Sequence, residues 1–144
     1  MSKFLNLKKN IKKNEGYSNT PYRDILGYRT IGYGHLIKKN EIFKEKKKIS
    51  KISLCKVFEE DFSLALKGYY KNYKNIKHNN KVKEVLIEMI FQLGAQGQNK
   101  FIKMNKHLKK NQLFMAALEM KKSLWHKQTP KRVEALIKKL LKHH

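Results

Sequence analysis

The segment from Glu15 to His35 constrains the fold most, because its composition differs from that of the surrounding chain. It reads EGYSNTPYRDILGYRTIGYGH, so tyrosines and β-branched residues are interleaved with glycines. Such runs are typical of short antiparallel strands joined by tight turns. We expect three strands, at about residues 17–23, 27–32 and 35–37. A small sheet is therefore predicted near the start of the chain.

Apolar residues recur at helical spacing through most of the remaining chain. Ser50, and Asn79 or Asn80, are suitable N-caps for two of the helices, and Thr129 followed by Pro130 is a typical start for the last one. We expect helices at about residues 3–14, 51–73, 80–93, 99–109, 112–122 and 130–141. The chain is therefore predicted to have an α+β, mostly helical fold.

The helix expected at about residues 80–93 is apolar over much of its circumference. A helix with this pattern is buried on most sides, so we expect it to be the central core helix of its lobe. Gly94 and Gly97 are predicted to end it, because glycine favours the conformation found just past a helix C-terminus.

The chain of 144 residues carries 34 lysine and arginine residues against 11 acidic ones, a formal net charge of +23. A polycation is drawn to anionic polymers, although a lysine excess accompanied by asparagine and isoleucine is also what an AT-rich genome encodes. No nucleic-acid-binding motif accompanies the charge, so we expect no specific nucleic-acid partner.

With Cys55 as the single cysteine, no intrachain disulfide is possible. No segment reaches the ~18 apolar residues of a membrane span.

Two carboxylic acids and a hydroxyl within the first segment form a candidate catalytic group. Eight residues separate Glu15 from Asp24, and five separate Asp24 from Thr30. Glycosidases pair a protonated carboxylic acid, which donates to the leaving oxygen, with an ionised carboxylate. Glu15 precedes Gly16 at an expected helix end, where the helix dipole and partial burial both disfavour the ionised form, so it is the better candidate for the acid. All three residues also have ordinary structural roles at such positions.

The pattern E-x8-D-x5-T, embedded in EG…YRDILGYRTIGYGH, resembles the catalytic signature of the phage-type lysozymes, glycoside hydrolase family 24. Residues 91–94 and 123–132 resemble the same family, so the resemblance extends from about Leu5 to Leu140. It implies one lysozyme domain with a small β-sheet lobe and a larger helical lobe flanking a cleft. The implied parts are a β-containing lobe at about residues 14–50, a linking helix at about 51–75, and a helical lobe of about 76–144 together with the first helix.

The resemblance also implies roles for individual residues. Glu15 matches the general acid, and Asp24 and Thr30 match the residues that handle water on the opposite face of the sugar. Leu36, Phe91, Gln92 and Trp125 match residues that line the saccharide site. The supporting residues are Arg132, which matches an arginine near the acid, and His35, which matches a histidine paired with Asp61. The ordinary alternative is core packing for the four saccharide-site residues and surface charge for Arg132, while the pairing of His35 with a carboxylate is itself a structural role.

Two positions depart from the family pattern. Met104 and Glu119 stand where relatives carry serine and asparagine residues that contact the glycan or its peptide, so these roles are not carried over.

The expected reaction is hydrolysis of the β-1,4 bond between N-acetylmuramic acid and N-acetylglucosamine in bacterial peptidoglycan. No cofactor and no metal ion are implied.

The expected setting is that of an endolysin from a phage or prophage. Without a signal peptide, we expect a monomer made in the host bacterial cytoplasm that acts on the cell wall after release. Its charge should also attract it to anionic envelope polymers. One alternative is a lytic transglycosylase, which uses the glutamate but not the Asp24 and Thr30 pair. The other is a cationic protein that disrupts the envelope by charge, without catalysis.

Overall fold

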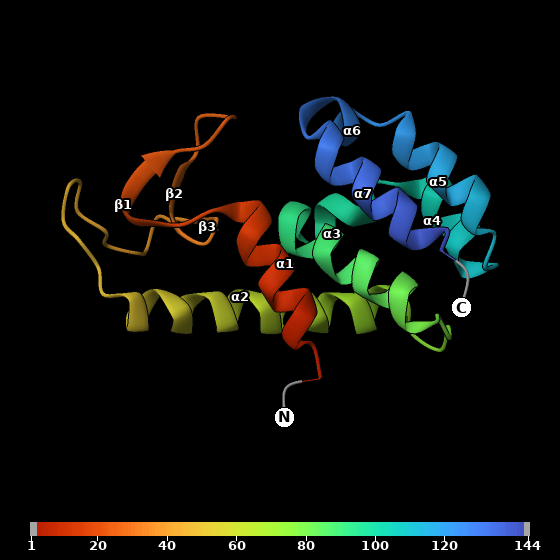
Figure 1. The fold of residues 1–144 in the computed structure, drawn as a ribbon, viewed down its shortest axis with the longest axis horizontal. Helices are drawn as coiled ribbons and strands as arrows, with labels where there is room; N and C mark the ends of the chain where they lie inside the picture. The colour runs from red at the N-terminus through yellow and green to blue at the C-terminus, as the bar shows by residue number, and fades with distance from the viewer. Residues whose placement is uncertain (1–2, 143–144) are drawn as a thin grey trace. The chain divides into compact units, whose positions relative to one another are not determined.

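The computed structural model describes residues 3–142, which form helices and one small sheet (Figure 1). The elements of this part of the chain are α1 (Leu5–Glu15), β1 (Ser18–Arg23), β2 (Arg29–Gly32), β3 (His35–Leu36), α2 (Lys51–Asn72), α3 (Asn80–Asn99), α4 (Ile102–Lys109), α5 (Leu113–Lys121), α6 (Leu124–Gln128) and α7 (Pro130–Leu140). The predicted α+β, mostly helical fold is confirmed. No helix within residues 3–142 is long and apolar enough to cross a membrane.

The chain divides into two compact units, the first ending at Leu64 and the second beginning at Ala65. The division falls within α2, so this helix contributes residues to both units. Helix α1 and the three strands belong to the first unit, and α3 to α7 belong to the second. The lobe boundaries implied by the resemblance, and the assignment of the first helix to the helical lobe, stay predictions.

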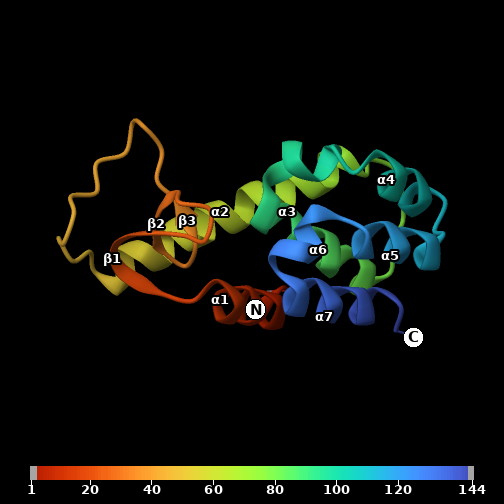
Figure 2. The same cartoon turned by 90° about the horizontal axis from the view of Figure 1, so that it is seen from above.

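The strands form one antiparallel sheet in the order β1-β2-β3 (Figure 2). Thr30 of β2 is opposite Tyr22 of β1 and also opposite Leu36 of β3, and Ile31 is opposite His35. Residues that are directly opposite each other lie on the same face of a sheet. Tyr22, Thr30 and Leu36 therefore share one face, while Ile31 and His35 share the other.

The core of the first unit joins α1, α2 and the turn that follows β2. Leu7 and Ile11 lie one helical turn apart on α1 and are buried, as are Leu54 and Phe58 at the same spacing on α2. The ring of Tyr33 packs edge-on against Phe58, with 5.7 Å between ring centroids. This contact anchors the turn between β2 and β3 on α2.

Helix α3 is the most buried helix of the second unit. Its buried apolar residues are Val82, Val85, Leu86, Ile87, Met89 and Ile90, which together cover more than one face of the helix. Helix α7 packs against it and buries one apolar stripe, Val133, Leu136 and Leu140. The prediction that residues 80–93 form a core helix agrees with this burial.

Two of the predicted N-caps are confirmed by hydrogen bonds. The Ser50 hydroxyl accepts a hydrogen bond from the Ser53 N–H at 3.2 Å, and the Asn79 side chain accepts one from the Val82 N–H at 2.9 Å. Each bond satisfies one of the backbone donors that a helix start leaves without an intrahelical partner.

The start of α7 differs from the prediction, because Thr129 does not cap it. The Thr129 hydroxyl instead donates to the Trp125 carbonyl at 3.2 Å, while Pro130 occupies the first turn as expected. The preceding five residues form α6, a short helix that the sequence analysis missed. Ser123 caps α6 by accepting a hydrogen bond from the His126 N–H at 3.1 Å.

The end of α3 also differs from the prediction. Gly94 has φ +78° and ψ 158°, which interrupts the helix as expected, but the chain resumes helical geometry and continues to Asn99. Gly97 therefore lies within a helical turn and does not end the helix. The extension brings Gln98 into a buried position, where its side chain bonds with those of Tyr73 and Asn105.

Candidate active site

Glu15 is the last residue of α1. Gly16 follows it with φ +74°, the left-handed conformation expected of a glycine at this position. The Gly16 N–H donates to the Lys12 carbonyl at 3.0 Å, which closes the last turn of the helix. Helix α1 therefore fixes the backbone of Glu15, and its side chain is partly buried.

Gly34, in the turn between β2 and β3, lies directly against the Glu15 carboxyl group. A Cβ atom built on Gly34 would be 2.3 Å from Glu15 Oε1 and 2.8 Å from Glu15 Cδ. Gly34 also has φ +73°, which side-chain-bearing residues rarely adopt. Both the close approach and the backbone conformation require glycine here, so Gly34 forms part of the wall that holds the Glu15 side chain. Gly34 lies within the catalytic motif, but its contact with Glu15 was not predicted from the sequence.

The Asp24 carboxylate holds the turn between β1 and β2. Its Oδ1 accepts hydrogen bonds from the backbone N–H groups of Leu26, at 2.9 Å, and Tyr28, at 2.8 Å. The Asp24 backbone N–H donates in turn to the Tyr28 carbonyl at 2.9 Å. These bonds fix the orientation of the carboxylate, and they leave Asp24 Oδ2 with no hydrogen bond to any other residue in the described range 3–142.

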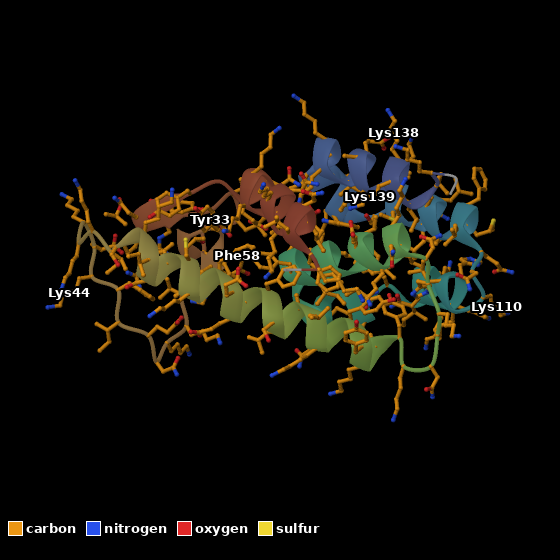
Figure 3. The ribbon with its side chains drawn as sticks, turned by 60° about the horizontal axis from the view of Figure 1, so that its bottom comes forward. Tyr33, Lys44, Phe58, Lys110, Lys138 and Lys139 are labelled. Atoms are coloured by element: carbon orange, nitrogen blue, oxygen red, sulfur yellow. The ribbon has the colours of Figure 1, made fainter. Side chains whose placement is uncertain are left out.

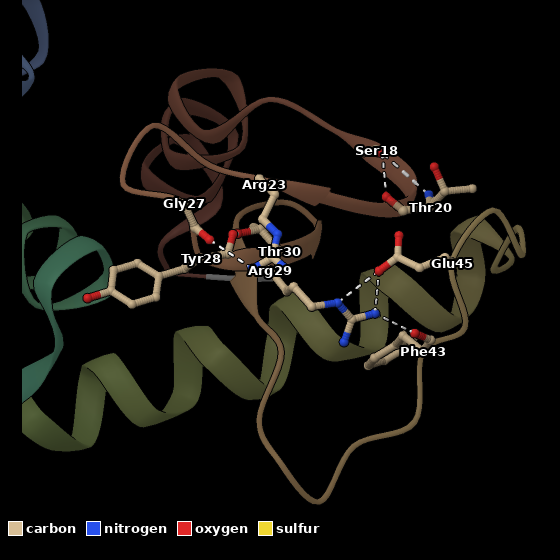
Figure 4. A network of polar contacts seen from close by, with 9 residues as sticks. All are labelled: Ser18, Thr20, Arg23, Gly27, Tyr28, Arg29, Thr30, Phe43 and Glu45. Atoms are coloured by element: carbon tan, nitrogen blue, oxygen red, sulfur yellow. Dashed lines mark hydrogen bonds and ion pairs between the residues drawn. The ribbon is translucent and has the colours of Figure 1, made fainter.

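Thr30 is connected to Asp24 through the same residue, Tyr28. The Thr30 hydroxyl donates to the Tyr28 carbonyl at 2.9 Å (Figure 4), and the Thr30 side chain is almost fully buried, at 2% exposed. Because its proton is committed to this carbonyl, the Thr30 hydroxyl can act toward a further group only as an acceptor. The structure thus places Asp24 and Thr30 at the two ends of one short hydrogen-bonded turn.

Tyr22 lies near both candidate carboxylates and was not singled out from the sequence. Burial raises the pKa of the Tyr22 phenol above its ordinary value, and the negative charges of Glu15 and then Asp24 raise it further. Both carboxyl groups are therefore close enough to the same phenol to act on its ionisation. Tyr22 is also the strand partner of Thr30, a register that the predicted strand ranges did not specify. The structure brings Glu15, Asp24 and Thr30 together around Tyr22.

His35 lies between two carboxylates on the other face of the sheet. Its Nδ1 is 2.7 Å from Asp61 Oδ2, the predicted partner, and its Nε2 is 2.9 Å from Glu41 Oε1. The hydrogen bond to Asp61 raises the pKa of His35, burial opposes this, and the bond to Glu41 adds to the increase. Burial alone would raise the pKa of Glu41, but the hydrogen bonds from the Lys38 N–H and from His35 outweigh it and lower that pKa. Glu41 was not singled out from the sequence.

Of the residues predicted to line the saccharide site, Leu36 lies in the first unit and the other three lie in the second. Leu36 is half exposed on β3. Gln92 links two of its neighbours, because its Oε1 accepts a hydrogen bond from the Trp125 indole at 2.9 Å and its Nε2 donates to Thr129 Oγ1 at 3.4 Å. Trp125 is buried, with its ring edge-on to Phe101. Phe91 is partly buried on α3.

Arg132 forms a buried ion pair within the second unit. Its Nε donates to Glu88 Oε2 at 2.9 Å, and the side chains of Arg132 and Glu88 are only 10% and 3% exposed. This pair joins α7 to α3. The predicted position of Arg132 near Glu15 stays a prediction, and Glu88 was missed because a glutamate among apolar residues of a helix gives no signal of its partner.

Met104 and Glu119, the two departures from the family pattern, line the same hollow in the second unit. The hollow has a volume of about 350 Å³ and is bounded by residues of α4, α5 and the turn before α6. The Glu119 carboxylate is held there by Lys122 Nζ at 2.8 Å.

No group of three or more histidine, cysteine, aspartate or glutamate side chains suited to a metal ion occurs in the part of the chain that the structure describes.

A helix-end glutamate and a turn aspartate, both near one tyrosine, could supply the two carboxyl groups that glycoside hydrolysis uses. The sequence profile of the family described as phage lysozyme matches residues 12–142. The chain belongs to this family and is a lysozyme. A relative named "Probable T4-type lysozyme 2", from Dictyostelium discoideum, is 34% identical over 156 aligned positions that cover 91% of each chain. "Probable T4-type lysozyme 1", from the same organism, is 32% identical over 156 positions with the same coverage.

Proposed function

We propose that this lysozyme hydrolyses the β-1,4 bond between N-acetylmuramic acid and N-acetylglucosamine in bacterial peptidoglycan, with Glu15 as the general acid. The observation that carries the proposal is the position of Tyr22, whose phenol responds to the charges of both Glu15 and Asp24. Two carboxyl groups that flank the scissile bond are what glycosidic hydrolysis requires. No metal ion or cofactor takes part.

Glu15 donates its proton to the leaving glycosidic oxygen. Two features of the structure support this role: the end of α1 fixes its backbone, and Gly34 leaves room for the carboxyl group while limiting its movement. A general acid must be held within hydrogen-bond reach of the atom that it protonates, and a side chain packed against backbone loses little freedom when the substrate binds.

Asp24 and Thr30 act on the water that attacks the opposite face of the sugar. Asp24 Oδ1 is occupied by the turn, while Oδ2 can accept a hydrogen bond from water. The Thr30 oxygen can accept another, because its own proton is donated to Tyr28. Water held by two acceptors directs its lone pair away from them and toward the sugar, which gives inversion at the anomeric carbon.

The fixed Asp24 turn favours hydrolysis over the transglycosylase alternative, which needs no residue to activate water. The setting as a phage or prophage endolysin, made in a bacterial cytoplasm and acting as a monomer, is part of the proposal. The two relatives named above come from Dictyostelium discoideum, so a setting outside phages is the alternative for the same reaction.

The test compares two isosteric variants on purified peptidoglycan. Glu15→Gln removes the acidic proton and should lower the cleavage rate by at least ~10³-fold, within the range that general acid catalysis and charge stabilisation supply. Asp24→Asn keeps an Oδ1 acceptor for the Leu26 and Tyr28 N–H groups, so it removes the charge without opening the turn. We expect a loss of ~10²-fold or more with an unchanged melting temperature. Near wild-type cleavage by Glu15→Gln would refute the assignment.

A further inference from the structure

The loop of residues 38–48, between β3 and α2, is not used by the proposed reaction. We call it the basic loop, because six of its eleven residues are lysine. All six lysines are exposed: Lys38, Lys39, Lys44, Lys46, Lys47 and Lys48. Figure 2 shows the loop extending away from the sheet.

Both acidic residues of the basic loop are bonded to basic side chains that lie outside it. Glu41 Oε1 is 2.9 Å from His35 Nε2, and Glu45 Oε1 is 2.8 Å from the Arg29 guanidinium. None of the six lysines forms an ion pair with any residue in the described range 3–142. The loop therefore turns its negative charges toward the sheet and presents an uncompensated row of positive charges to the solvent.

The basic loop is held in a defined shape at both ends and in the middle. The Ile37 N–H donates to the Arg29 carbonyl and the Ile49 N–H donates to the Asn19 carbonyl, each at 2.9 Å. Between these ends, the Arg29 guanidinium donates to the Phe43 carbonyl at 2.7 Å and also binds Glu45 (Figure 4). Because the loop is already held in place, it would lose less conformational entropy on binding a partner than a free chain would.

Two tight turns shape the exposed edge of the loop. One covers residues 38–41 and the other residues 44–47, each closed by a backbone hydrogen bond. Ile42 lies between these turns and is 86% exposed. Lys44 follows it and points away from the ribbon (Figure 3). An exposed apolar side chain in a segment rich in exposed lysines is a composition that suits the boundary of headgroups and acyl chains.

We propose that the basic loop is a contact surface for an anionic lipid bilayer, with its lysines on the headgroups and Ile42 at the acyl boundary. Lysines near an anionic bilayer each strengthen binding by about fivefold, and an inserted isoleucine adds apolar burial. A hydrophilic polyanion would satisfy the lysines but would leave Ile42 in water. The bilayer is therefore the partner that uses both features.

The test measures sedimentation of the whole protein with phospholipid vesicles, which contain no glycan, so the result does not depend on the proposed muramidase activity. The loop variant replaces Lys44, Lys46, Lys47 and Lys48 by Gln. The matched control replaces Lys74, Lys77, Lys109 and Lys110 by Gln, four exposed lysines that form no ion pair within residues 3–142. Both variants lose the same net charge. The vesicles contain phosphatidylcholine alone or mixed with phosphatidylglycerol.

The wild-type protein should bind the mixed vesicles and not those of phosphatidylcholine alone. The loop variant should bind the mixed vesicles at least about 30-fold more weakly, and the control less than about fivefold more weakly. Equal losses in the two variants would show that net charge acts without a specific surface, and would overturn the proposal. Ile42→Asn should weaken binding severalfold, whereas Ile25→Asn, at a residue 87% exposed in a different turn, should not. If Ile42→Asn binds like the wild type, the surface fits a hydrophilic polyanion and not a bilayer.

Discussion

Replacement of Gly34 by alanine tests how strictly the fold positions the general acid. The added Cβ would lie 2.3 Å from Glu15 Oε1, whereas ordinary contact begins at 3.4 Å, so the carboxyl group must retreat by about 1 Å. A misplacement of about 1 Å can lower a catalytic rate by ~10²-fold. The left-handed φ of +73° adds strain of roughly 1–2 kcal/mol, which corresponds to a loss of about 2–8 °C in melting temperature.

The assay measures cleavage of purified peptidoglycan at a temperature where all variants are folded, together with their melting temperatures. Gly94→Ala is the matched control, because Gly94 has φ +78° but an added Cβ meets nothing within 4 Å. It should lose stability at least as much as Gly34→Ala while its cleavage rate stays near that of the wild type. A Gly34→Ala protein that retains more than about half of the wild-type rate would show that the contact with Glu15 does not position the acid.

Three further outcomes are expected. Tyr22→Phe removes a phenol that stays protonated at working pH and lies near both carboxylates. We expect this phenol to help position them, so kcat should fall by ~3–30-fold, the effect of about one hydrogen bond; an unchanged rate and pH–rate profile would contradict this expectation. For the His35 and Glu41 pair, the raised histidine pKa gives stability that is lost as pH rises through its folded value, and the lowered glutamate pKa gives stability that is lost as pH falls through its folded value. The melting-temperature difference between the wild type and Glu41→Gln should therefore be greatest near pH 5–6, and a flat difference from pH 4 to 9 would refute the pair. Breaking the buried pair by Arg132→Met should cost about 3–5 kcal/mol of unfolding free energy, and the double variant with Glu88→Leu should recover part of it; simple additivity in denaturant titrations would show that the two side chains do not interact.

The strands and the ends of α1 and α2 could be predicted because local chemistry decides them. Gly16 takes the left-handed conformation that its position after a helix suggests, and Ser50 caps α2 as its hydroxyl allows. Thr129 has the same capping chemistry, but the carbonyl of Trp125 competes for its hydroxyl. That competition depends on α6, which has only five residues and too few apolar positions to give a periodic signal.

The candidate site could be predicted as a set of residues but not as a geometry. The spacing of Glu15 and Asp24 marks them as carboxylates in one segment, yet only the fold shows that both lie near Tyr22. Glu41 was missed for a similar reason, because its partner His35 is set by the path of the basic loop and not by any repeat in the sequence. Whether such side chains meet depends on the conformation of turns several residues long, which local sequence patterns do not determine.

The central claim is that Glu15 protonates the leaving oxygen while Asp24 and Thr30 direct a water molecule to the opposite face of the sugar. The most direct measurement is proton NMR of the first products released from purified peptidoglycan fragments by the wild-type protein. We predict free reducing ends that are initially in the α configuration, because water attacks from the face opposite the broken β bond. Initial β products would show retention, and 1,6-anhydro ends would show that no water takes part; either result would contradict the roles given to Asp24 and Thr30.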